Sequence, residues 1–216
     1  MIYIKYILFD LDGTLTNPFE GITKSVQYAL ASFGIEEKQE NLKKFIGPPL
    51  KYAFMEYYNF SEDKAVEAVK KYRERFSVKG LYENDLYDGI PKLLGRLKEN
   101  GKTIILATSK PIEFAEKIIE HFNLTQYFDF LTGSTLKGER DTKGEVIEYA
   151  LSQMKITDLS QAVMIGDREH DIIGAKENGI ESIGILYGFG DREEFETAGA
   201  DYICETVEDI GKLLIE

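Results

Sequence analysis

The sequence of 216 residues predicts an α/β fold, a doubly wound parallel sheet with an inserted all-helical unit. From about residue 81 onward, short apolar runs alternate with helical patterns, as strands and crossover helices do in a parallel sheet. Residues 21–79, in contrast, have helical periodicity without a strand pattern. The apolar runs before Asp10, Thr108 and Asp167 each end directly in a carboxylate or hydroxyl side chain.

The first expected strand lies before Asp10, and it is followed by two carboxylates. Asp10 and Asp12 are two residues apart, so on an extended backbone their side chains point in the same direction. Two like charges held this close are costly without a cation. A hard divalent ion such as Mg²⁺, which prefers oxygen ligands, would satisfy them. The structural alternative is a plain Asp-Gly turn at Gly13.

Residues 17–83 are expected to form the helical unit. Apolar residues recur with a helical period from Ile22 to Phe33, and Gly34 is expected to follow the end of that helix. Ser61 is expected to begin a helix that runs to Phe76. Further helical segments are expected at 41–46 and 50–58, on either side of a Gly-Pro-Pro breaker.

Residues 1–16 and 84–216 are expected to form the sheet and its crossover helices. The later strands are expected at 103–107, 128–132, 162–165 and 182–186, and the helices at 90–100, 112–122, 146–154, 172–178 and 207–215. Their alternation predicts parallel strands with right-handed crossovers. Acidic residues at the carboxyl ends of such strands lie in the crevice where these folds bind ligands.

Three further segments contain candidate site residues. Thr108 and Ser109, followed by Lys110 and Pro111 at the start of a helix, could seat a phosphate, although Thr108 could also be only an N-cap. Lys143 lies at a helix start, where the helix dipole mildly disfavours a cation, and this suggests another role. In the last segment Asp167 follows an apolar strand, and Asp171, one helical turn later, could hold a metal-bound water or be only a first-turn acid.

These segments, in this order, resemble the four motifs of the haloacid-dehalogenase-like phosphohydrolases, and the resemblance covers essentially the whole chain. The first is Asp10-Leu11-Asp12-Gly13-Thr14-Leu15-Thr16, and the fourth has the spacing G-D-x-x-x-D from Gly166 to Asp171. The third departs from the common form, because many relatives carry Lys-Pro before the helix, whereas this chain has Arg140-Asp141-Thr142-Lys143-Gly144, with Lys143 where the resemblance needs a cation. Lys137 and Arg140 therefore remain alternative cations for that motif.

The resemblance implies a Rossmann-like core with a helical cap and a reaction through an aspartyl-phosphate. Asp10 would attack phosphorus, and Asp12 would act as general acid and then general base. Mg²⁺ would be held by Asp10, the backbone carbonyl of Asp12 and Asp167. Thr108 and Ser109 would hold the phosphate oxygens, with Lys110 nearby, and Lys143 would supply a fixed positive charge. Because dehalogenases of the superfamily lack the second aspartate, Asp12 argues against dehalogenation.

The cap position resembles the branch that acts on small phosphorylated metabolites. The turn at Gly47 to Lys51 resembles a cap loop that reaches the substrate, although a plain helix connection is the alternative. Lys24 is a further candidate anion contact. The first expectation is a phosphatase similar to phosphoglycolate phosphatases. A 5′-nucleotidase and a phosphomutase of the β-phosphoglucomutase type remain alternatives, and a non-catalytic binding protein is disfavoured by the complete set of motif residues.

Composition excludes several other classes. The chain has 26 basic and 38 acidic residues, a formal charge of −12, so a nucleic-acid polymer would be repelled. Its single Cys204 fits a reducing compartment. No apolar run approaches the ~20 residues of a membrane span, and the N-terminus leads into a strand pattern rather than a signal peptide. We therefore expect a cytoplasmic enzyme with no membrane partner, either monomeric or homodimeric.

Overall fold

The computed structural model describes residues 4–137 and 139–215, and the chain divides into two compact units. The sheet unit consists of the chain up to Thr16 together with the chain from Leu86 onward, and the helical unit is Asn17–Asp85. The chain passes between the units in two short strands, β2 (Thr16–Asn17) and β3 (Asp85–Leu86), which pair with each other. Among the described residues, no helix is both long enough and apolar enough to cross a membrane.

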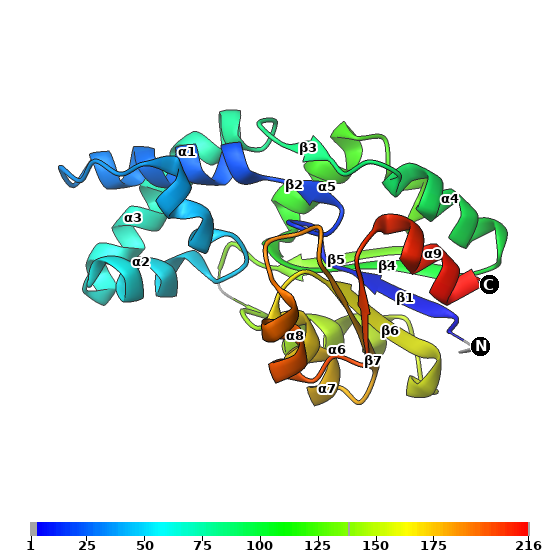
Figure 1. Cartoon of the computed structure of the whole chain (residues 1–216). Helices are drawn as coiled ribbons and strands as arrows, with labels where there is room; N and C mark the ends of the chain where they lie inside the picture. The colour runs from blue at the N-terminus through cyan, green and yellow to red at the C-terminus, as the bar shows by residue number, and fades with distance from the viewer. Residues whose placement is uncertain (1–3, 138, 216) are drawn as a thin grey trace. The chain divides into compact units, whose positions relative to one another are not determined.

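The sheet unit contains six parallel strands in the order β5-β4-β1-β6-β7-β8 (Figure 1), which confirms the predicted fold class. The strands are β1 (Tyr6–Phe9), β4 (Thr103–Pro111), β5 (Phe130–Ser134), β6 (Ala162–Gly166), β7 (Glu181–Ile185) and β8 (Tyr202–Cys204). The chain order reverses direction across the sheet at β1, which lies between β4 and β6. In open α/β sheets, ligands bind outside the carboxyl ends of the strands at such a switch point.

Helices precede, connect and follow these strands. They are α4 (Ile90–Glu99), α5 (Ile112–His121), α6 (Lys143–Gln153), α7 (Glu169–Glu177), α8 (Arg192–Ala198) and α9 (Val207–Ile215), with short 3₁₀ turns at Thr125–Tyr127 and Leu159–Gln161. Sequence periodicity did not reveal α8 and β8, because seven and three residues are too few to show a period.

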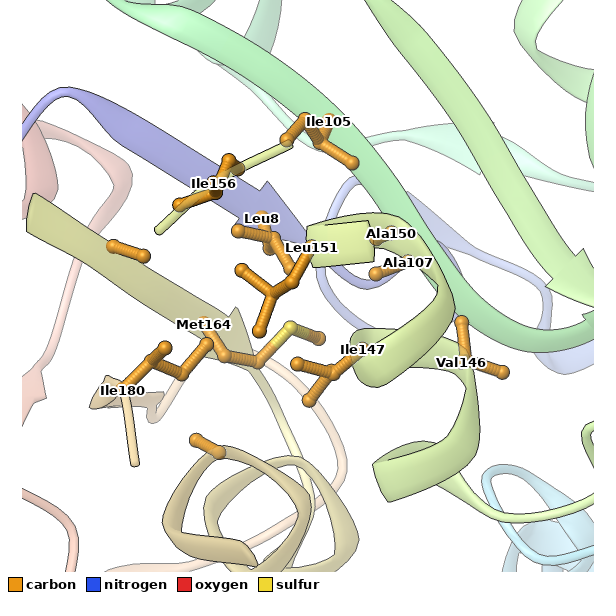
Figure 2. Packing of buried hydrophobic residues seen from close by; sticks show 12 residues of the cluster. Leu8, Ile105, Ala107, Val146, Ile147, Ala150, Leu151, Ile156, Met164 and Ile180 are labelled. Carbon is orange, nitrogen blue, oxygen red and sulfur yellow. The ribbon is translucent and has the colours of Figure 1, made fainter. Parts of the chain in front are cut away.

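The core of the sheet unit is built from strand side chains that lie in register. Leu8 on β1 is paired with Ile105 on β4 and with Met164 on β6, so all three point to the same face of the sheet. Figure 2 shows Ile147 and Leu151 of α6 packed against them. Burial of each such side chain contributes about 1.5–3 kcal/mol. Helices α4 and α9 pack together on the other face (Figure 1).

The helical unit contains α1 (Phe19–Ala31), a 3₁₀ segment η1 (Gln39–Phe45), α2 (Leu50–Tyr58) and α3 (Glu62–Arg75), followed by a π turn at Phe76–Gly80. Its interior is aromatic. The Phe54 ring stacks on Phe60 at a centroid distance of 6.0 Å and lies 5.0 Å from the Phe45 ring. As the sequence suggested, Ser61 caps α3 by accepting a hydrogen bond from the Lys64 N–H, and Gly34 has a left-handed φ of 74° after α1.

Candidate active site

The carboxyl ends of β1, β4 and β6 bring three of the predicted site residues to the switch point. Asp10 follows β1, Thr108 lies in β4, and Asp167 follows β6. The N–H of Asp10 donates to the carbonyl of Ile165 at 2.9 Å, so the pairing of β1 and β6 extends to the first carboxylate. Asp10 and Asp167 are only 7% and 1% exposed. Buried carboxylates of this kind need a partner, because an isolated buried charge is very costly.

Lys143 provides part of that partner charge. Its Nζ lies 2.8 Å from Oδ1 of Asp10 and 2.8 Å from Oδ1 of Asp171, and it donates to the carbonyl of Ala107 at 3.0 Å. Burial lowers the pKa of Lys143, but the two carboxylates outweigh burial and hold the pKa above its ordinary value. Lys143 is therefore a fixed cation between two carboxylates.

Close packing of α6 against α7 allows Lys143 to reach this position. A capping box at Thr142 and Glu145 begins α6, so that Lys143 occupies its first turn. On α7, a Cβ at Gly174 would lie 2.9 Å from the backbone nitrogen of Gly144 and 3.0 Å from Cγ of Lys143. Glycine at position 174 thus leaves room for the Lys143 side chain between the helices.

Both carboxylate oxygens of Asp171 are engaged by neighbouring groups. Oδ1 pairs with Lys143, and Oδ2 accepts a hydrogen bond of 3.1 Å from the N–H of Arg168. A Cβ on Gly166 would collide with the Asp171 side chain at 2.0 Å, so this glycine makes room for it. Burial, opposed by Lys143, raises the pKa of Asp171 from 3.8 to about 6. Asp171 therefore holds Lys143 in place with one carboxylate oxygen. With the other oxygen it caps the first turn of α7.

One carboxylate oxygen of Asp167 accepts a hydrogen bond, and the other has no hydrogen-bond partner in the part of the chain that the structure describes. Oδ2 accepts a hydrogen bond of 2.9 Å from the N–H of Phe189, whereas buried Oδ1 has no hydrogen-bond partner among the described residues. Burial and then the charges of Asp171 and Asp10 raise the pKa of Asp167 well above 3.8. Asp10, Asp167 and Asp171 each offer an oxygen, and these oxygens lie within 4.8 Å of one another. This donor set of carboxylate oxygens fits a hard divalent cation.

Asp12 lies two residues after Asp10 and forms an ion pair with Lys110 through its Oδ2. The sequence predicted that Lys110 contacts the substrate. In this structure its ammonium group is instead paired with the Asp12 carboxylate. Burial raises the pKa of Asp12 even though Lys110 opposes it, so this carboxyl group holds a proton more readily than an exposed aspartate does. Thr108 is buried, and its Oγ1 accepts a hydrogen bond of 3.2 Å from the N–H of Lys110. Half-buried Ser109 follows it in β4.

Arg140 and Lys137, the alternative cations of the third motif, have surroundings different from those of Lys143. The Nε of Arg140 donates to the carbonyl of Gly133 at 3.1 Å, and its guanidinium lies 4.3 Å from the centre of the Tyr149 ring. Lys137 is exposed in the loop before it. Among these three candidates, Lys143 lies within 2.8 Å of the Asp10 carboxylate and is the cation that the structure favours for the third motif.

The cap residues that the sequence singled out belong to the helical unit. Gly47 adopts a φ of 106° in the turn before α2, a conformation that favours glycine. Lys51, in the first turn of α2, forms an ion pair of 2.5 Å with Glu62 at the start of α3. Lys24 pairs with Glu20 on α1 at 2.7 Å. Both lysines are therefore held by acidic residues of the same unit.

Sequence reasoning missed the segment Tyr187-Gly188-Phe189-Gly190, which follows β7. Besides the bond from Phe189, the N–H of Gly190 donates to the carbonyl of Asp167 at 3.0 Å. A Cβ on Gly188 would lie 2.4 Å from Cβ of Asp167, so only glycine allows this approach. Two glycines that flank an aromatic residue directly after an expected strand were the available signal.

Comparison with known proteins agrees with this geometry. A family model described as haloacid dehalogenase-like hydrolase matches residues 7–185, a span that includes every motif residue from Asp10 to Asp171. The chain belongs to the haloacid dehalogenase-like hydrolase family. Phosphatases of this family generally use a divalent metal, which agrees with the carboxylate cluster.

Individual members of the family resemble the chain over nearly its full length. A 5′-nucleotidase of Pseudomonas aeruginosa is 50% identical over 199 residues, which cover 92% of this chain and 90% of that protein. A phosphoglycolate phosphatase of Vibrio parahaemolyticus is 24% identical and covers 96% of this chain and 94% of its own. A crystal structure named a predicted phosphatase, from Clostridium acetobutylicum, has a TM-score of 0.95, 51% identity and 98% coverage of both chains. Family and relatives together support a phosphatase, that is, a phosphoric monoester hydrolase.

Proposed function

We propose that the protein is a Mg²⁺-dependent phosphatase that hydrolyses a small phosphomonoester through an aspartyl-phosphate on Asp10. The observation that carries the proposal is the environment of Asp10 at the switch point of the sheet. Its carboxylate is buried, ion-paired at 2.8 Å with Lys143 and clustered with Asp167. Such a carboxylate is held in one orientation beside a fixed cation, which suits an in-line nucleophile.

In the first half of the reaction, an oxygen of Asp10 forms a bond to phosphorus while the bond from phosphorus to the ester oxygen breaks. The departing oxygen takes a proton from the carboxyl group of Asp12, and the alcohol leaves. Thr108 and Ser109 bind the phosphate oxygens with their hydroxyl and backbone N–H groups. Lys110 lies beside Asp12, where its charge would attract the anionic substrate.

In the second half, a water oxygen attacks the phosphorus of the aspartyl-phosphate and the bond to Asp10 breaks. Asp12, now ionised, takes the proton from that water, and inorganic phosphate is released. Throughout, Lys143 offsets the charge on Asp10 and fixes its orientation, while Asp171 holds Lys143 in place.

The metal would be held by Asp10, Asp167 and the backbone carbonyl of Asp12. Open Oδ1 of Asp167 supports this assignment, because a buried carboxylate oxygen without a donor needs a cation. Asp171 is proposed as a brace rather than a ligand, since both its oxygens are engaged. Bound Mg²⁺ would neutralise negative charge on the phosphoryl group during transfer.

For the substrate, we propose nucleoside 5′-monophosphates first and phosphoglycolate second. The sequence motifs alone favoured phosphoglycolate. The 50% identity to a 5′-nucleotidase, against 24% to a phosphoglycolate phosphatase at similar coverage, reverses this order. The fold itself does not decide, because one fold supports many substrates.

The test is a phosphate-release assay over a panel of nucleoside monophosphates, phosphoglycolate, sugar phosphates and an aryl phosphate. Each would be measured with Mg²⁺ and with a chelator, for the wild type and for Asp10→Asn. We expect Mg²⁺-dependent release that Asp10→Asn lowers by several orders of magnitude with the fold retained. Full activity of Asp10→Asn would rule out the covalent route. Conversion of a sugar phosphate into its isomer without phosphate release would instead identify a mutase.

A further inference from the structure

The loop that carries Asp12 is a compact turn built on one carbonyl. The carbonyl of Leu11 accepts hydrogen bonds from the N–H groups of Thr14, Leu15 and Thr16 at 3.2, 2.9 and 3.0 Å. The N–H of Gly13 donates to the carbonyl of Thr16 at 2.7 Å. Because these bonds make the turn nearly rigid, the direction of the Asp12 side chain depends on how the whole turn is anchored to the sheet unit.

Two anchors outside the turn are tyrosines that contact each other. The phenol of Tyr187 donates to the carbonyl of Thr14 at 3.1 Å, across 173 positions of sequence. The N–H of Tyr87 donates to the carbonyl of Leu15 at 3.1 Å. The two rings meet edge to face, with centroids 5.1 Å apart and an interplanar angle of 69°. The two rings therefore restrict each other, while the phenol of Tyr187 and the backbone N–H of Tyr87 hold neighbouring carbonyls of the turn.

Tyr187 also begins the segment that holds Asp167. Two residues later, the N–H of Phe189 donates to Oδ2 of Asp167 at 2.9 Å. Between them, a Cβ on Gly188 would lie 2.5 Å from the carbonyl of Gly13 and 2.4 Å from Cβ of Asp167. The turn with Asp12 and the segment with Phe189 are thus packed directly against each other, and Tyr187 is hydrogen-bonded across that contact.

We propose that Tyr187 is a positioning residue, whose phenol hydrogen bond to Thr14 fixes the Asp12 turn relative to the Asp167 carboxylate. Its effect on the reaction rests on the proposed function, in which Asp12 protonates the leaving group. The phenol keeps its proton, because burial and the neighbouring Tyr87 and Asp167 raise the pKa of Tyr187 above its ordinary value. The hydrogen-bond donor is therefore present across the working pH range.

The kinetic test compares Tyr187→Phe with the wild type on two esters, a nucleoside monophosphate and an aryl phosphate with an activated leaving group. The ring and its packing on Tyr87 remain, so the variant should fold. Loss of one hydrogen bond that aligns the acid should lower kcat/KM about tenfold on the unactivated ester. On the activated ester, whose leaving group needs little protonation, the decrease should be less than about threefold. The matched control is Tyr202→Phe, which removes a phenol from the start of β8 and should change neither value.

A second measurement reports the position of the turn without using activity. Amide hydrogen exchange of Gly13, Leu15 and Thr16 should increase about tenfold in Tyr187→Phe at pH 7, while exchange of the β1 and β6 amides stays as in the wild type. Tyr202→Phe should leave all of these rates unchanged. Faster exchange confined to the turn supports a positioning role for Tyr187, because a general loss of stability would increase exchange in the strands as well.

Three results would overturn the inference. Unchanged exchange of the turn would show that Tyr187 does not hold it. An equal loss of kcat/KM on both esters, with faster exchange throughout the sheet, would show a merely structural residue. Faster exchange of the turn with unchanged kinetics would show that its position does not matter for the reaction. A failure of the proposed function is distinguishable from all three, because the wild type would then release no phosphate from either ester.

Discussion

Both units of the chain have ion pairs open to solvent, but the described residues of the sheet unit also include a buried cluster of charged side chains. In the sheet unit, Asp10, Asp167, Asp171 and Lys143 are all buried within one cluster. In the helical unit, the acidic and basic side chains of the described ion pairs are partly or fully open to solvent, as in the pair of Lys51 with Glu62. The side chain of Lys143 is 4% exposed, whereas that of Lys51 is 36% exposed.

Lys143 and Lys51 each lie in the first turn of a helix, yet we expect their ion pairs to contribute very differently to stability. A surface ion pair contributes little because water and salt screen it. A buried cation between two carboxylates is different, since its removal leaves those carboxylates unpaired in a low-dielectric interior. Burial of this kind has a folding cost, and proteins accept it where charge is needed for chemistry. The comparison therefore supports the proposal that the reaction takes place in the sheet unit, and it leaves substrate selection as the role to be tested for the helical unit.

The largest effect is expected from Lys143→Met, compared with Lys51→Met in the helical unit. Loss of the buried cation should destabilise the fold by about 3–5 kcal/mol at neutral pH, on the order of 10 °C in melting temperature, and abolish turnover. Lys51→Met should leave the melting temperature close to that of the wild type. Thermal unfolding of the two variants in the same buffer is the measurement. Similar melting temperatures would mean that buried and exposed pairs contribute alike, and the contrast between the units would fail.

A smaller effect is expected from pH and Mg²⁺ acting on the same cluster. The pKa of Asp171 is raised from 3.8 to about 6, and that of Asp167 is raised as well, so the folded state binds these protons more tightly than the unfolded chain. Their contribution to stability is complete below the unfolded pKa. That of Asp171 is lost as pH rises through about 6, and that of Asp167 is lost as pH rises through its own raised pKa. Without metal, the cluster should therefore destabilise the protein more at about pH 7.5 than at about pH 5.

Mg²⁺ should reverse this trend, because it binds the ionised carboxylates in competition with protons. The increase in melting temperature on addition of Mg²⁺ should be larger at about pH 7.5 than at about pH 5. Asp167→Asn, which removes a proposed ligand, should suppress the increase at both pH values. An increase that is independent of pH, or one that persists in Asp167→Asn, would place the ion outside the cluster.

The smallest effect is expected from Lys51→Ala on substrate selection. If the turn from Gly47 to Lys51 contacts the leaving group, KM for an anionic substrate such as phosphoglycolate should rise, with a loss in kcat/KM of at most about tenfold. The effect is bounded because Glu62 already engages the ammonium group. A neutral aryl leaving group should be hydrolysed as by the wild type. Unchanged kinetics on both would remove Lys51 from substrate recognition.

The sequence by itself determined the fold class and the strands whose carboxyl ends carry candidate site residues. Strand and helix periodicities are local properties, so the parallel sheet and most of its elements could be predicted from residue order. The positions of Asp10, Thr108 and Asp167 at the ends of apolar runs were also visible, because each lies beside its own strand. The resemblance to the family then predicted that these segments come together in one active site.

Only the tertiary structure decided which groups meet. It determined the strand order with β1 at the switch point, the pairing of Lys110 with Asp12, and the contact of Lys143 with both Asp10 and Asp171. It also brought Tyr187 to the Asp12 turn. Each of these contacts joins residues that are distant in the sequence. Close approach at Gly174 makes room for Lys143, and close approach at Gly188 brings the Tyr187 segment to the Asp12 turn. Local pattern carries no information about that approach, which is set by packing of the complete sheet unit.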